Sequence, residues 1–249
     1  MHIQIQPLFP LMLTAVHLLW AADDQALVVR NAIARSSIIH APFMVESLAN
    51  SLLVELGMSS SLQNDLEKLT TMAKLELCAD LSNKGSFSRG GRCAQVFADL
   101  TKLRNDYVHP KRSKNTNVEK EGEAYFIGVS QRWSGLGIAK NPEVWDVKDA
   151  HAVLAKVMDA MDEYLMDVIG ICNRRIERIL LHHVVGDGDS KTLVTVPEKP
   201  WSLTLPEGVS LPRFLARMES HDAHCMKEGM KPCANHAQQD DSDGLLSRR

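Results

Sequence analysis

The stretch that decides the fold assignment closes a helical pattern and reads Leu103-Arg104-Asn105-Asp106-Tyr107-Val108-His109-Pro110. On a continuous α-helix, two residues five positions apart point about 140° away from each other. Pro110 changes this, because the residue before a proline is pushed out of the helical region. We therefore expect His109 just past the last turn, where its ring can turn back toward Arg104. Such a guanidinium and imidazole suit RNA phosphodiester chemistry, and two solvated side chains at a helix end are the alternative.

This string resembles the R-x4-6-H signature of HEPN domains, in which a polar residue directly follows the arginine, as Asn105 does here. The resemblance takes in an upstream helical pattern at residues 40–50 and a long amphipathic helix after the motif. In organisation it covers roughly residues 25–183, and its specificity lies in the motif. It implies an all-α fold, a HEPN-like helical bundle.

The resemblance also implies a reaction, metal-independent endoribonuclease cleavage, in which a ribose 2′-OH attacks the neighbouring phosphate. His109 would be the general base or acid, Arg104 would stabilise charge on the phosphoryl oxygens, and Asn105 would orient the imidazole or the phosphate. Members of this kind serve as toxins or in phage defence. They work as homodimers with both motifs facing one cleft, often beside a cognate nucleotidyltransferase-like antitoxin. The alternative is a non-catalytic helical module that binds RNA, a nucleotide or a partner protein.

Two further sets of residues are candidates for the same site. Glu46 stands four residues before Asn50 on the upstream helix and would either orient Arg104 or His109 or make a helix-surface pair. A group of basic residues near the motif would form an RNA-binding rim, with a solvated basic loop as the alternative. This group consists of Arg89, Arg92, Lys111, Arg112 and Lys114.

Composition narrows the class of protein. Aromatic residues make up only 5% of the chain, which favours packed helices over a β-sandwich. The net charge of −3 does not by itself indicate nucleic-acid binding. Five scattered cysteines fit reduced thiols and a cytoplasmic location. The apolar stretch from Leu8 to Trp20 is too short to span a bilayer, so we expect a buried helix and no membrane partner.

The sequence predicts no cofactor and no metal. It contains no G-x-x-x-x-G-K, no G-x-G-x-x-G after a strand and no G-x-S-x-G. A tail cluster has residue types that suit zinc, but its spacing matches no familiar finger. This cluster consists of His221, His224, Cys225, Cys233 and His236.

Periodicity and turn signals predict four parts along the chain. These are an N-terminal packing helix over 1–23, the HEPN-like helical domain over 24–183, a hairpin extension over 184–212 and a flexible tail over 213–249. Inside the domain we expect a small β-hairpin that joins 124–129 to 135–139. A helix of some thirty-five residues, from Asp146 to about His183, has an apolar stripe long enough to favour a homodimer.

Overall fold

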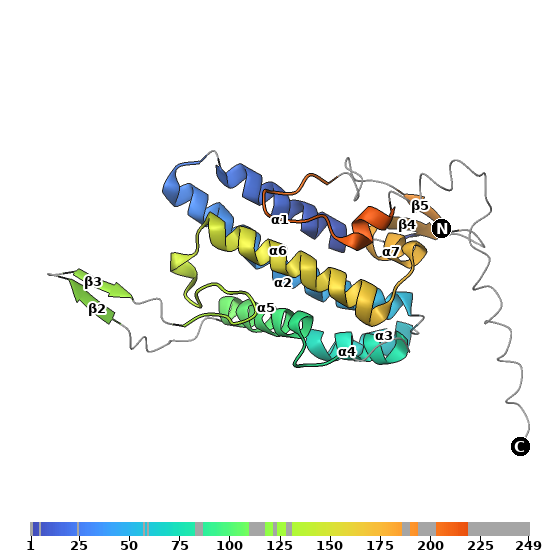
Figure 1. The fold of residues 1–249 in the computed structure, drawn as a ribbon. Coiled ribbons are helices and arrows are strands. Elements are labelled where there is room, and N and C mark those ends of the chain that lie inside the picture. The colour runs from blue at the N-terminus through green and yellow to red at the C-terminus, as the bar shows by residue number, and fades with distance from the viewer. Residues whose placement is uncertain are drawn as a thin grey trace, which may run out of the picture.

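The structure is a computed structural model and describes residues 2–4, 6–23, 25–56, 58, 60–82, 87–109, 118–121, 124–127, 131–185, 190–193 and 203–218. Over these residues the protein is predominantly helical, which confirms the predicted all-α class. Figure 1 shows the helices α1, α2, α5 and α6 lying side by side with their long axes roughly aligned.

The two N-terminal helices form the first part of the bundle. α1 spans Leu8–Asp23 and is buried along one face, as predicted for this apolar stretch. α2 spans Leu27–Glu55 and contains Pro42, and it packs against α1, α4, α5, α6 and α7. By length and composition α2 could cross a membrane, but 67% of its most apolar window is buried inside the protein. Such burial is typical of a core helix.

Three shorter helices follow. α3 spans Ser60–Leu66, α4 spans Thr71–Ser82 and α5 spans Arg92–Val108. Leu62, Leu66, Leu69, Ala73 and Leu77 recur at helical spacing, which predicts one continuous helix, but the structure divides this stretch at residues 67–70. The hydroxyl of Thr70 accepts a hydrogen bond from the backbone N–H of Ala73, which caps α4 and accounts for its separate start.

The predicted thirty-five-residue helix is wrong in its extent. α6 spans Val147–Glu163 and starts with a capping box between Asp146 and Asp149. A π-helix over Tyr164–Ile169 (η2) follows, Gly170 takes a left-handed conformation at φ 61°, and α7 covers Asn173–Leu180. Glycine adopts this conformation without the steric cost of a side chain, so the chain turns there and the apolar stripe folds back into its own core.

That interruption removes the sequence argument for a dimer. The stripe residues Leu154, Val157, Leu165, Ile176 and Ile179 are all at most 2% exposed within a single chain. The stripe leaves little apolar surface for a second copy to cover, since Val168 is only partly exposed and Cys172 is its exposed member. A homodimer therefore stays a prediction that rests on the resemblance alone.

The strands pair differently from the predicted hairpins. β2 (Val118–Glu121) pairs with β3 (Ala124–Ile127), while Ala139 forms an isolated bridge with Arg132, so the pairing of 124–129 with 135–139 is wrong. β5 (Ser190–Leu193) pairs with β4 (His182–Val185), and β4 also pairs with β1 (His2–Gln4). The predicted partner of residues 192–196, Trp201–Leu205, begins outside the described residues. For β3 a nearer antiparallel partner was available, since only two residues separate it from β2.

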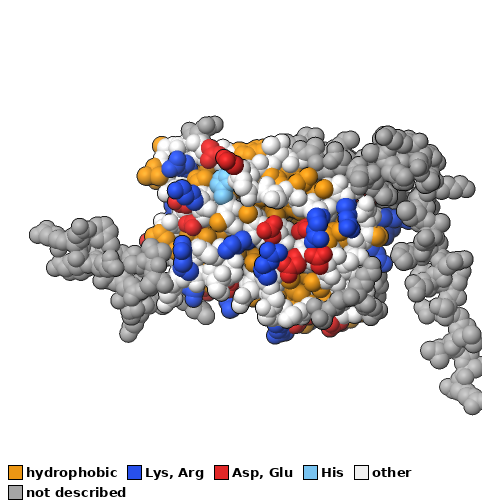
Figure 2. Space-filling view, viewed as in Figure 1, with side chains coloured by type: hydrophobic (Ala, Val, Ile, Leu, Met, Phe, Trp, Pro, Cys, Tyr) orange, Lys and Arg blue, Asp and Glu red, His pale blue; other side chains and the backbone are white. Residues whose placement is uncertain are grey.

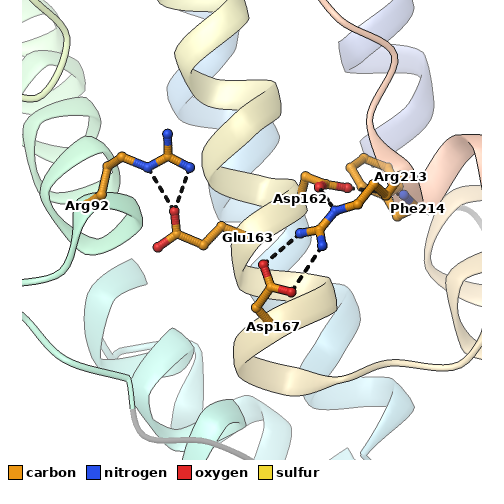
Figure 3. Close-up of polar contacts among 6 residues, drawn as sticks. All are labelled: Arg92, Asp162, Glu163, Asp167, Arg213 and Phe214. Carbon is orange, nitrogen blue, oxygen red and sulfur yellow. Dashed lines mark hydrogen bonds and ion pairs between the residues drawn. The ribbon is translucent and has the colours of Figure 1, made fainter.

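The predicted boundary of the flexible tail at residue 213 is too early. Residues 213–218 form a last short helix, and Phe214, Leu215 and Met218 join the main core with at most 1% exposure. Arg213 forms ion pairs with Asp162 on α6 and Asp167 on the π-helix, as Figure 3 shows, and these hold the short helix against the bundle. The predicted tail from 219 to 249 lies outside the described residues.

We predict a measurable cost for removing one buried hydroxyl. The Tyr164 hydroxyl donates a hydrogen bond of 2.6 Å to the backbone carbonyl of Leu75, and the ring packs edge-on against Phe87 and Phe97. Tyr164→Phe should lower the free energy of unfolding by about 1 kcal/mol or more, because the carbonyl keeps its burial and loses a partner. Urea denaturation measures the change. Tyr107→Phe, at a residue 51% exposed, is the matched control, and an equal loss in both variants would contradict this account.

Candidate functional site

The arginine of the motif lies where the last turns of α5 pass α2. Arg104 Nη2 stands 3.5 Å from Glu46 Oε2, and Arg104 Nη1 donates to Asn105 Oδ1 at 3.3 Å. Both distances exceed the roughly 2.7–2.9 Å of a strong charge-assisted hydrogen bond. The buried Nε of Arg104 has no hydrogen-bond partner among the described residues. The guanidinium is therefore loosely held and keeps a donor unused.

Glu46 reaches Arg104 from α2 and so brings a third candidate residue to the site. It does not pair with Asn50, whose Oδ1 accepts instead from Lys74 Nζ at 2.8 Å. The contact shows that Glu46 is positioned to orient Arg104. Whether it serves that role in catalysis stays a prediction.

His109 lies just past the end of α5, as Pro110 led us to expect. α5 ends at Val108, and His109 leaves the helical region at φ −123° and ψ 67° while its backbone N–H still donates to the Asn105 carbonyl. Its side chain is exposed. Over the described part of the chain no hydrogen bond or ion pair joins the ring to Arg104, so the ring is free to meet a ligand from solvent.

Arg89 and Arg92 do not lie at the motif. Arg92 begins α5, twelve residues before Arg104, and a rise of 1.5 Å per residue puts about 18 Å between them. Arg92 pairs with Glu163, and this contact raises the pKa of the Arg92 guanidinium. Arg89 pairs with Glu76, and this contact lowers the pKa of the Glu76 carboxyl. Figure 3 shows the Arg92 pair, and Figure 2 shows Lys and Arg interleaved with Asp and Glu on this face. The structure thus does not gather these two arginines with Arg104, although the sequence placed them near it.

The remaining basic candidates, Lys111, Arg112 and Lys114, lie outside the described residues. They follow His109 closely in sequence, so their role in binding RNA stays a prediction. The histidines and cysteines of the tail cluster also lie outside. In the described part of the chain no group of three His, Cys, Asp or Glu side chains could hold a metal ion.

Sequence reasoning missed a hollow beside the motif, here called the aromatic hollow. Its walls come from the end of α5 and from the segment that leads into α6 through a short 3-10 helix (η1, Pro142–Val144). It encloses about 260 Å³, including its open mouth. The side chains that line it include Leu103, Asp106, Tyr107, Trp133, Lys140 and Trp145. The signal in the sequence was a pair of tryptophans in a chain poor in aromatic residues.

Close packing fixes the far wall of the aromatic hollow. The backbone N–H of Gly135 donates to Asp99 Oδ2 at 2.7 Å, and a Cβ at Gly135 would lie only 2.9 Å from the Gln95 carbonyl oxygen on α5. The chain then folds back on itself, and the backbone N–H of Trp133 donates to the backbone carbonyl of Ile138. A rigid backbone therefore holds Trp133 against α5.

Two buried cysteines are poor candidates for chemistry. Burial raises the pKa of the Cys78 thiol to about 12, and burial together with the nearby Glu163 carboxylate raises the pKa of Cys93 to about 12. The thiolate is the nucleophilic form of cysteine, so neither thiol is activated near neutral pH. The residues of the motif remain the better candidates.

Comparisons with known proteins found no relative of this chain. No protein-family model matches the chain, and no curated protein or solved structure shows significant similarity to it.

We predict that Arg104 and Glu46 are only weakly coupled. Their side chains are 39% and 34% exposed, whereas Arg178 meets Glu55, which is 9% exposed, at 2.8 Å. A double-mutant cycle with Arg104→Gln and Glu46→Gln should give a coupling energy of at most about 1 kcal/mol, as for solvent-exposed pairs. The same cycle on Arg178 and Glu55 is the control and should give more. If the Arg104 pair were the stronger, its guanidinium would be too firmly held to turn to a phosphate.

Proposed function

We propose that this chain is a metal-independent endoribonuclease of the toxin or phage-defence kind, with its active site at the end of α5. The observation that carries the proposal is the group at that end, where Arg104 contacts Glu46 and Asn105 and the exposed His109 follows the last turn. An arginine whose side chain is 39% exposed and only loosely paired suits a phosphate, and an exposed imidazole suits proton transfer near neutral pH.

The reaction follows from these two groups. His109 takes the proton from a ribose 2′-OH, whose oxygen bonds to the adjacent phosphorus as the P–O5′ bond breaks. A proton passes to the departing 5′ oxygen, which leaves a 2′,3′-cyclic phosphate and a 5′-hydroxyl. Arg104 stabilises the charge on the non-bridging oxygens in the transition state. The side-chain oxygen of Asn105 accepts a weak hydrogen bond from the same guanidinium.

A homodimer belongs to the same proposal, because proton removal and proton delivery are best served by two groups. With both motifs facing one cleft, one His109 acts as base and the partner's His109 acts as acid. This arrangement comes from the resemblance to HEPN domains, as does a nucleotidyltransferase-like antitoxin as a further partner. The proposed setting is the cytoplasm.

A second candidate function is a non-catalytic module that binds RNA, a nucleotide or a partner protein. The observation that favours it is the state of the site in one chain: Glu46 partly neutralises Arg104, and no described side chain orients the ring of His109. A general base is usually oriented by a neighbouring group. Cleavage and binding assays together separate the two functions.

The catalytic prediction concerns His109→Ala and Arg104→Ala. Each should slow RNA cleavage by on the order of 10²–10⁴, the usual contribution of a positioned acid–base group, while the fold is kept. Cleavage of a labelled single-stranded RNA by the purified full chain, with and without EDTA, is the measurement, and EDTA should leave the rate unchanged.

Matched controls are His151→Ala on α6 and Arg175→Ala on α7, which remove the same side-chain types elsewhere in the bundle. Both should cut at the wild-type rate. The proposal fails if the His109 and Arg104 variants also cut at that rate, or if the wild-type chain leaves every RNA tested intact.

A further prediction concerns RNA affinity, whether or not the RNA is cut. Each phosphate that a cation neutralises releases counterions, so binding should weaken steeply with salt. Replacing Lys111, Arg112 and Lys114 together by Gln should weaken binding and flatten the salt slope, by about one unit for each phosphate that is no longer neutralised.

The matched control for RNA affinity is a double replacement of Arg89 and Arg92 by Gln, because both side chains already pair with carboxylates. This variant should change the slope less. An unchanged slope in the triple variant would remove these three residues from the RNA-binding surface. Salt-dependent binding without cleavage, equal in wild type and His109→Ala, would favour the binding module.

A further inference from the structure

The chemistry of the aromatic hollow points to a ligand. Three of its walls are aromatic rings, from Tyr107, Trp133 and Trp145. Tyr107 stays 51% exposed, whereas the two tryptophans are 6% and 2% exposed. A flat apolar group that enters from solvent would therefore meet one accessible ring and two fixed ones.

One residue that lines the hollow carries a polar group without a partner. Trp145 Nε1 donates to the Ala139 carbonyl at 2.6 Å, but the buried Trp133 Nε1 has no hydrogen-bond partner in the described structure. A buried donor without an acceptor is costly and calls for an explanation such as a ligand. Asp106 adds a carboxylate acceptor at the wall, and Lys140 Nζ stands 5.2 Å from the centre of the Trp133 ring.

The size and place of the hollow narrow the choice of ligand. The hollow is small and opens to solvent, so a ligand there is one small planar group that keeps an edge in water. Tyr107 follows Arg104 by three residues on α5, and residues three apart on a helix are neighbours, with Cβ atoms about 5–6 Å apart. A group in the hollow is thus adjacent to a phosphate at Arg104.

We propose that the aromatic hollow binds a nucleobase of single-stranded RNA, next to the phosphate that Arg104 and His109 receive. The base stacks on Tyr107, an acceptor on its edge takes the Trp133 indole N–H, and Asp106 accepts from an exocyclic amine. This inference rests on the proposed function and names the part of the substrate that the site grips. Splayed-out bases that stack on aromatic side chains are the usual targets of sequence-specific RNA recognition.

The test uses the full chain and two kinds of probe, the four nucleoside 3′-monophosphates and inorganic phosphate. Quenching of tryptophan fluorescence reports the hollow directly, because Trp133 and Trp145 line it. Every nucleotide that enters should quench the fluorescence and bind more tightly than inorganic phosphate. Inorganic phosphate should compete for the Arg104 end without quenching. Equal affinity for phosphate and all four nucleotides, or no quenching at millimolar nucleotide, would overturn the proposal.

Variants separate the base from the phosphate. Tyr107→Ala removes an exposed ring and should keep the fold, while weakening nucleotide binding at least about fivefold, the lower end for one base stacked on an aromatic ring. Its affinity for inorganic phosphate should not change. Arg104→Ala should weaken binding of both probes. Trp133→Phe keeps a ring but loses the N–H, and it should change the order of preference among the four bases.

Trp20→Phe, on α1 and outside the hollow, is the matched control and should leave nucleotide quenching intact. The outcome also separates this inference from the proposed function. RNA cleavage at the wild-type rate by both Tyr107→Ala and Trp133→Phe would overturn the base site and leave the nuclease standing. Base-dependent binding by a chain that cuts no RNA would support the base site and overturn the proposed nuclease.

Discussion

Between Ile38 and Leu53, α2 is enclosed by the other long helices, and the rest of the structure depends on that burial. Its large apolar side chains face the common core, and its small ones let α1 approach closely, since the buried Ser37 hydroxyl donates to the Ala15 carbonyl. A fully buried aliphatic side chain contributes about 1.5–3 kcal/mol, so a sliding of α2 by one turn would cost several such contributions. The register of α2 against α5 is fixed in this way, and that register puts Glu46 opposite Arg104.

Much of the helical content followed from sequence because apolar residues recur at helical spacing, most clearly along one face of α5 and of α6. The end of α5 also followed, since Pro110 acts on its neighbour through local sterics. The break after Glu163 did not. Apolar residues continue through the π-helix and into α7, so the pattern reads as one helix, and only the left-handed Gly170 marks the turn. Strand partners were missed because several short segments could pair, and the choice among them depends on tertiary packing.

In the candidate site, too, the features set by local sequence could be predicted and those set by tertiary packing could not. Arg104, Asn105 and His109 were found because they are consecutive or nearly so, and their arrangement depends on one helix end. Glu46 was chosen by residue type, and its contact with Arg104 depends on the packing of α2 on α5. Arg89 and Arg92 were placed near the motif because they are near in sequence, although the length of α5 separates them. The aromatic hollow stayed hidden because its walls come from segments on both sides of residues 110–130.

The docking of Phe214 has a consequence for how this chain is made. Its ring is fully buried in a core whose other members come mostly from residues 8–181, and Arg213 anchors it to α6 and the π-helix. During synthesis the helices emerge first, and the slot for Phe214 stays empty until some thirty more residues have been added. At about 5–20 residues per second, that is a delay of roughly a few seconds. For that interval the nascent bundle has an apolar slot exposed to solvent, so its folding can finish only after the last short helix has emerged.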